Sequence, residues 1–113
     1  MGKSSGYNQY LMSDVFGDIP GIIFKRMFGG FGYYLDGVIF AILADEQLYF
    51  KVGEGNVRDY EKLGSKPFIY PMKNGKSTTL SYWELPAEIL EDPEKLPVWI
   101  EKSVEENLKS KKR

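Results

Sequence analysis

The segment from Ile22 to Val52 constrains the fold of this chain more than any other part of the sequence. It is rich in β-branched and aromatic residues, and turn-forming residues interrupt it at Asp36-Gly37 and again at 44–47. Short connections of this kind join antiparallel strands. The segment therefore predicts an antiparallel meander, whose strands we expect at residues 23–35, 38–44 and 47–52.

The middle strand of the meander is apolar at every position from Val38 to Leu43. An antiparallel strand with one solvated face alternates between apolar and polar residues, and this strand does not. We therefore expect it to lie in the centre of the sheet, with both of its faces covered.

The first strand of the meander is long and contains glycine at positions 29, 30 and 32. Glycine inside a strand often marks a bulge or the close approach of another backbone, so we predict a bulge or a sharp bend there. The residues around the bend, Arg26, Phe28, Gly29 and Gly30, are candidates for an interaction site. A purely structural role for the glycines is the simpler interpretation.

Helical spacing and turn residues organise the rest of the chain. Asn74-Gly75 is the dipeptide best suited to a two-residue turn and predicts a second hairpin. An apolar stripe near the C-terminus predicts a helix with one buried face and with Trp99 beside the stripe. The stripe consists of Leu96, Ile100, Val104 and Leu108. The other expected elements are a helix at 7–17, a helix at 57–63 between Asn56 and Gly64, strands at 67–73 and 76–83, and a short helical turn at 87–91.

The order of these elements is α-β-β-β-α-β-β-α. A chain of 113 residues is long enough for one hydrophobic core and too short for two. We therefore predict a single domain over residues 1–113, with flexible ends at 1–6 and 109–113. The expected fold is α+β, a two-layer sandwich of helices and a five-stranded, mainly antiparallel sheet.

The composition excludes several kinds of active site. The sequence has no histidine and no cysteine, so it cannot form a Cys-His zinc site, a thiol nucleophile, a Ser-His-Asp triad or a disulfide. Gly75-Lys76-Ser77 resembles the end of a phosphate-binding loop but lies in a predicted hairpin. The acidic pairs Asp45-Glu46 and Glu91-Asp92 fall in predicted exposed turns. We therefore expect no catalytic residues, no metal site and no cofactor, and a protein that is not an enzyme.

Charge is distributed unevenly along the chain, although its net value is only −1. Residues 84–106 contain two bases and eight acids, a net charge of −6, whereas residues 107–113 contain four bases and no acid. A domain that holds DNA needs a strongly basic surface, so we expect no specific DNA binding by the chain alone. The lack of cysteine, of a signal peptide and of a long apolar run predicts a cytoplasmic protein that does not contact membranes.

Neighbouring aromatic residues occur on two predicted strands, as Tyr33-Tyr34 and Tyr82-Trp83. Successive side chains of a strand point to opposite faces, so only one member of each pair can face the core. If the other members are left uncovered, they form a patch suited to a protein partner or a ligand. Tyr82 and Trp83 are therefore candidate interaction residues, and Trp99 is a candidate centre for a homodimer contact.

Four segments together carry a family resemblance. They read RMFGGFGYY at 26–34, DGVIFA at 36–41, LYFKV at 48–52 and TLSYWELP at 79–86. In this order they resemble the N-terminal domain of the TfoX/Sxy competence regulators over about residues 10–105, and we interpret the chain as a stand-alone form of that domain. The resemblance implies a two-layer α+β fold and a role as a transcriptional co-regulator that acts with the cyclic-AMP receptor protein. It implies neither enzymatic activity nor particular ligand residues.

The leading hypothesis is therefore a non-catalytic regulatory domain that binds a protein partner, such as transcription machinery or the cyclic-AMP receptor protein. The alternative is a small-ligand-binding domain, or an enzyme, that uses Arg26, Tyr82 and carboxylates around the glycine bend. The charge distribution disfavours a third class, direct binding of DNA.

Overall fold

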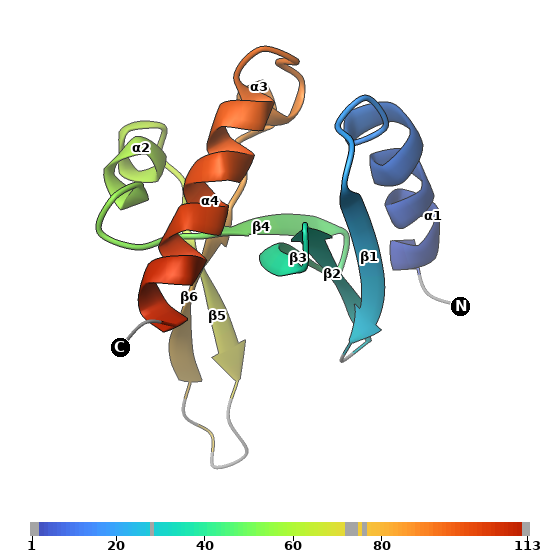
Figure 1. Ribbon diagram of the computed structural model, residues 1–113. Helices are drawn as coiled ribbons and strands as arrows, with labels where there is room; N and C mark the ends of the chain where they lie inside the picture. Colours follow the sequence, from blue (N-terminus) through green and yellow to red (C-terminus); the bar gives the residue numbers. More distant parts are fainter. Residues whose placement is uncertain (1–2, 28, 72–74, 76, 112–113) are drawn as a thin grey trace.

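An antiparallel sheet with helices on one face forms the frame of the molecule (Figure 1). The computed structural model describes residues 3–27, 29–71, 75 and 77–111, and within these residues the chain forms four α-helices and six strands. The strands are β1 (Ile22–Met27), β2 (Gly30–Leu35), β3 (Val38–Ala44), β4 (Gln47–Lys51), β5 (Pro67–Pro71) and β6 (Ser77–Glu84), in the sheet order β1-β2-β3-β4-β6-β5. The helices are α1 (Lys3–Tyr10), which continues as a π-helical segment (Leu11–Val15), α2 (Val57–Lys62), α3 (Ala87–Leu90) and α4 (Leu96–Lys111). The predicted α+β class is confirmed.

The predicted strand at 23–35 is two strands, so the prediction of five strands is wrong by one. β1 and β2 form a hairpin in which Met27 is paired with Gly30. Gly29 has φ +78°, a left-handed conformation that glycine adopts without steric cost. A Cβ atom on Gly30 would overlap the carbonyl oxygen of Leu43, so Gly30 allows β3 to approach. The glycines thus produce a full chain reversal rather than a bend.

A bulge lies one strand further on, where β2 pairs with β3. The pairing shifts between Tyr33, which is opposite Ala41, and Tyr34, which is opposite Ile39. The extra residue on β3 is Phe40, and both Phe40 and Ala41 are fully buried. The bulge therefore places two consecutive residues of β3 in the core, which strict alternation does not allow.

The core lies between one face of the sheet, which we call the inner face, and the helices. Phe40 is at its centre, with ring centroids 5.8 Å from Phe16 and 5.4 Å from Phe50. The core also contains residues of every helical element, among them Leu11, Tyr60, Ile89, Leu96 and Ile100. Burial of such side chains is worth about 1.5–3 kcal/mol each, so this layer supplies most of the stability.

The opposite, outer face of the sheet is not packed in this way. β3 is central, as predicted, but the expectation that both of its faces are covered is wrong. Ile39 and Ile42 lie on the outer face and stay half-buried, and among the described residues the helix-packed core contains no side chain of that face.

Helix α4 crosses the sheet and is fixed by polar contacts as well as by apolar ones. Leu96 and Ile100 are buried as predicted, but Leu108 is 44% exposed, so the predicted stripe is wrong in its last turn. There the buried face consists of polar residues. The Ser103 hydroxyl donates to the carbonyl of Lys51 at 2.9 Å, and the Asn107 amide donates to that of Ile39 at 2.7 Å.

The expected turns at 36–37 and after α2 have left-handed residues where they are needed, whereas Asn74 of the expected Asn74-Gly75 turn lies outside the described residues. Asp36 and Gly37 have φ 51° and 85°, and Gly64, after α2, has φ +74°. Asn56 precedes α2 but makes no capping bond; its side chain instead accepts from the Gly53 amide at 2.8 Å and donates to the carbonyl of Lys51. In the part of the chain that is described, no helix is both long and apolar enough to span a membrane.

Candidate functional site

The predicted glycine-bend site is not assembled in the structure. Arg26 is exposed on β1, with its guanidinium 5.5 Å from the centroid of the Phe31 ring on the inner face. Gly29 lies in the β1–β2 turn, Gly30 is the first residue of β2, and Phe28 is outside the described residues. Tyr82 is on the outer face of β6, so Arg26 and Tyr82 occupy opposite faces with three strands between theirs.

The two tryptophans contribute to packing. Trp83 follows Tyr82 on β6 and points to the inner face, where it is half-buried against the core. Trp99 on α4 lies against Tyr60 of α2, with ring centroids 4.6 Å apart. Both side chains therefore connect elements of the fold, and neither stands free at the surface.

The outer face carries aromatic residues paired with cations, as the alternation of Tyr33-Tyr34 and Tyr82-Trp83 requires. The Lys25 ammonium lies 5.0 Å from the centroid of the Tyr34 ring, and that of Lys51 lies 5.6 Å from that of Tyr82. Burial, with a smaller effect of Tyr34, raises the pKa of Tyr82 to about 12, and burial lowers the pKa of Lys51. These lysines and rings shield one another, which makes this face a weaker candidate for a binding site.

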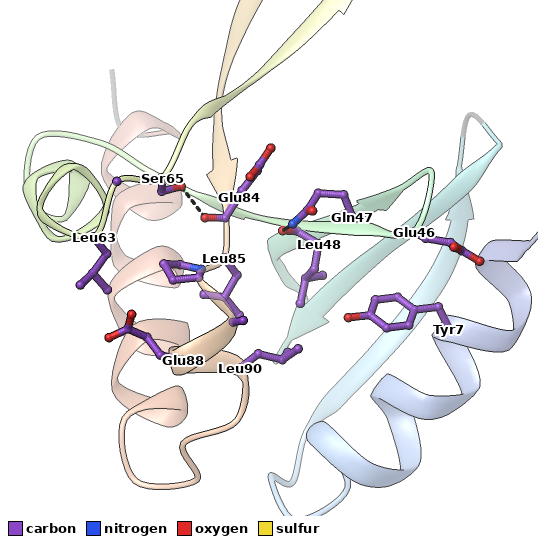
Figure 2. A pocket seen from close by; sticks show the side chains of 13 residues that line it. Tyr7, Glu46, Gln47, Leu48, Leu63, Ser65, Glu84, Leu85, Glu88 and Leu90 are labelled. Carbon is purple, nitrogen blue, oxygen red and sulfur yellow. Dashed lines mark hydrogen bonds between the residues drawn. The ribbon is translucent and has the colours of Figure 1, made fainter.

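A cavity of about 420 Å³ opens where four distant segments meet (Figure 2). The segments are α1, the β3–β4 turn with the start of β4, the end of α2, and the end of β6 with α3. Its lining residues are Tyr7, Glu46, Gln47, Leu48, Leu63, Gly64, Ser65, Glu84, Leu85, Pro86, Ala87, Glu88 and Leu90. We call this site the α1–α3 groove.

Backbone and side-chain hydrogen bonds hold the walls of the α1–α3 groove together. The Ser65 hydroxyl donates to the carbonyl of Glu84 at 2.6 Å, which attaches the end of α2 to β6. The amide of Leu85 donates to the carbonyl of Leu48 at 2.9 Å, which attaches the segment before α3 to β4. The groove is therefore part of the framework of the fold and does not depend on one loose loop.

The floor of the groove is apolar and its rim is acidic. Figure 2 shows the Tyr7 ring pointing from α1 toward Leu48 and Leu90, with Leu63 and Glu88 on the far side. Glu46 and Glu88 contribute carboxylates to the lining, whereas Glu84 contributes its backbone carbonyl and directs its side chain to the outer face beside Tyr49. No lysine or arginine is among the lining residues described. The groove thus offers apolar contact together with negative charge.

The carboxylates add to the raised pKa values of two nearby tyrosines. The pKa of Tyr7 is raised mainly by burial and further by Tyr10 and Glu46. The pKa of Tyr49, on the outer face of β4, is raised by burial and then by Glu84 and Asp45. Burial is the larger cause for both tyrosines, and the carboxylates add a smaller effect of the same sign.

The β3–β4 turn that presents Glu46 is unusual. Asp45 and Glu46 have φ 52° and 65°, the conformation in which Asn-Gly is the ordinary pair. Left-handed residues other than glycine cost of order 1 kcal/mol and are enriched at functional sites. This turn therefore adds a second reason to select the groove.

The α1–α3 groove could not be predicted from the sequence, because its lining comes from four segments that meet only in the folded chain. Two signals in the sequence point toward it: the acidic pair in the turn at 44–47 and the net charge of −6 over residues 84–106. Neither signal identifies which acids share one surface, and most of them, such as Glu91 and Glu101, lie elsewhere. Among the described residues, no group of acids is arranged to hold a metal ion.

The fold and groove define a small α+β domain with an open antiparallel sheet and an acidic surface groove. The chain matches the family model described as the TfoX N-terminal domain over residues 14–107. Because this match covers most of the chain, the protein belongs to the TfoX N-terminal domain family, and the resemblance found in the sequence is confirmed. A search of curated proteins found no match for the chain.

Proposed function

We infer that this protein is a non-catalytic regulatory domain that acts in the control of competence genes by binding another protein through the α1–α3 groove. One observation carries the inference. The groove combines an apolar floor, including Leu48 and Leu90, with the carboxylates of Glu46 and Glu88 and no base in its lining. Such a surface complements a segment that carries both apolar and basic side chains.

The charge of the groove supports a protein rather than DNA as the direct partner. A protein holds a DNA backbone with lysine and arginine, and the rim residues Glu46 and Glu88 would repel the phosphates. Proteins that bind DNA are themselves rich in basic segments. A DNA-bound activator, such as a cyclic-AMP receptor protein, or the basic surface of the transcription machinery is therefore the partner that fits best with the family.

The experiment compares two leucines of nearly equal exposure. Leu63 lines the groove and is 39% exposed, whereas Leu108 on α4 is 44% exposed and outside it. Leu63→Lys places a cation in the groove, and Leu108→Lys provides the matched control. In the cells from which the chain comes, we expect Leu63→Lys to lower a DNA-uptake-gene reporter at least about tenfold, and Leu108→Lys to leave it within about twofold.

A second pair of variants tests the charge of the groove rim separately from the apolar floor of the groove. Glu88 lines the groove, whereas Glu101 is an exposed acid on α4. Glu88→Lys should lower the reporter and Glu101→Lys should not. Wild-type reporter output from both groove variants, with protein levels unchanged, would rule out this function for the groove. A sub-micromolar, sequence-dependent gel shift by the purified chain alone would contradict the choice of a protein partner.

The volume of the cavity favours a second candidate, the binding of a small organic cation. About 420 Å³ lies within the range of small-molecule sites. Titration calorimetry of the purified chain with an arginine ester and with a polyamine distinguishes the two candidates. Binding that Glu88→Lys abolishes supports the small ligand, and no heat at millimolar concentrations leaves the protein partner.

A further inference from the structure

Strand β1 presents an exposed edge with apolar side chains on both faces. It is the first strand of the sheet order, and no described strand is paired with its outer side. Ile23 on the outer face is 51% exposed, and Phe24 on the inner face is 43% exposed. An edge of this kind is a template for pairing with another strand.

The hydrogen-bonding register shows which groups of β1 are free. The amide of Asp36 donates to the carbonyl of Gly21 at 3.3 Å, in the same register that pairs Ile23 with Tyr34. Bonded and non-bonded pairs alternate along an antiparallel ladder, so the odd-numbered residues of β1 bond to β2. The N–H and C=O groups of Ile22, Phe24 and Arg26 therefore point away from the sheet.

The charged residues of β1 do not guard this edge. Lysine or proline commonly prevents an edge strand from pairing. Here Lys25 lies 5.0 Å from the Tyr34 ring and Arg26 lies 5.5 Å from the Phe31 ring, so both cations lean back over β2. The opposite edge of the sheet differs, because β5 begins at Pro67 and ends at Pro71.

We propose that β1 pairs with β1 of a second copy of this chain, antiparallel about a two-fold axis at Phe24, to form a dimer with one continuous sheet. In this register Phe24 lies opposite Phe24 of the second copy, Ile22 opposite Arg26, and Ile23 opposite Lys25. Phe24 to Phe24 and both Ile22–Arg26 contacts are bonded pairs, so all the free groups of the central edge find partners.

The alternative registers are worse for identifiable reasons. A shift by two residues in one direction places Lys25 directly opposite its own copy, and like charges in that position are destabilising. The same shift in the other direction brings Pro20, which has no N–H, opposite Arg26 at a bonded position. The register centred on Phe24 avoids both, which identifies a second copy as a suitable occupant of the edge.

The dimer leaves the α1–α3 groove open, since no residue of β1 lines that groove. One six-residue strand gives an interface at the small end of the range for specific association. We therefore expect a reversible dimer that forms at about 10–100 μM and remains monomeric well below that range.

Sedimentation equilibrium on three purified proteins tests the surface. Phe24→Lys removes the central contact, and Ile69→Lys makes the same change on the opposite edge strand, where Ile69 is 57% exposed. Wild type and Ile69→Lys should dimerise as concentration rises, whereas Phe24→Lys should remain monomeric with an unchanged circular dichroism spectrum. A wild type that is monomeric up to about 1 mM overturns the proposal, as does a dimer that Phe24→Lys leaves intact.

Single cysteines test the register, because the chain has none of its own. Phe24→Cys places two thiols opposite each other across the two-fold axis. In Lys25→Cys the two positions are two residues out of register, with Cα atoms about 8 Å apart, beyond the reach of a disulfide. Under mild oxidation we expect Phe24→Cys to form a covalent dimer at least about tenfold faster than Lys25→Cys. Equal rates overturn the proposed register.

Discussion

Tyr33 and Tyr34 are neighbours on β2 with the same side chain, yet they have opposite roles in the structure. Tyr33 points to the inner face, is 0% exposed and donates its hydroxyl hydrogen bond to the Asn8 side chain at 2.7 Å. Tyr34 points to the outer face, is half-buried and lies under the Lys25 ammonium. The comparison shows that the helical layer, rather than residue type, determines which face stabilises the fold.

The change with the largest expected effect removes helix α4 from the inner layer. Truncation after Asp92 deletes α4, and with it the buried Leu96 and Ile100 and the polar contacts of Ser103 and Asn107. At about 1.5–3 kcal/mol for each large apolar side chain, the loss is comparable to the stability of a small domain. The 1–92 fragment should be unfolded or aggregated by circular dichroism. A native-like spectrum would mean that α4 is not essential to the inner layer.

Substitution of Gly30 should have the next largest effect on stability, although Gly30 does not belong to the inner face. By alternation it belongs to the outer face, yet it is buried because the backbone of Leu43 lies against it. Gly30→Val should lower the free energy of unfolding by about 3 kcal/mol, because β2 and β3 would have to separate. Gly29→Ala, at φ +78° in open space, should cost about 1 kcal/mol. Urea unfolding of both variants measures the difference, and equal values would contradict the close approach.

The glycine hairpin also shows where sequence reasoning stops. The strands at 38–44 and 47–52 and the helix at 57–63 were predictable, because alternation, turn residues and a terminal glycine act locally. The sequence predicts one strand over 23–35, because Gly29 and Gly30 are compatible with either a bulge or a turn. At 13 residues it exceeded the usual strand length, and that signal favours a hairpin.

The parts that could not be predicted depend on tertiary contacts. Leu108 has the spacing of a buried residue but is 44% exposed, and the last turns of α4 are instead attached to the sheet by the hydrogen bond from Asn107 to the carbonyl of Ile39. The α1–α3 groove combines Tyr7, Glu46 and Glu88, which no sequence period relates. Local chemistry thus predicts elements, whereas the depth and charge of a surface require the assembled fold.

Stability at high pH should show a smaller effect, because tyrosines with a raised pKa occur on both faces of the sheet. The pKa of Tyr33 is raised by burial, and that of Tyr82 is raised to about 12. The uncharged form is therefore favoured in the folded state, so the corresponding stability is complete below pH 10 and is lost as the pH rises from 10 toward 12. Melting temperatures should fall over this interval, and the fall should be smaller for Tyr82→Phe. If the melting temperature of Tyr82→Phe falls as far as that of wild type, the outer face contributes nothing to the loss of stability at high pH.

The most direct test of the difference between the two faces removes one oxygen atom from each neighbour. Tyr33→Phe leaves the buried Asn8 side chain without its partner, and an unsatisfied buried group costs about 1–3 kcal/mol. Tyr34→Phe removes a hydroxyl from the half-buried outer face and should change the free energy of unfolding by less than about 0.5 kcal/mol. Urea unfolding of the two variants beside wild type is the decisive measurement. A loss in Tyr33→Phe alone supports the account, and equal losses in the two variants would contradict it.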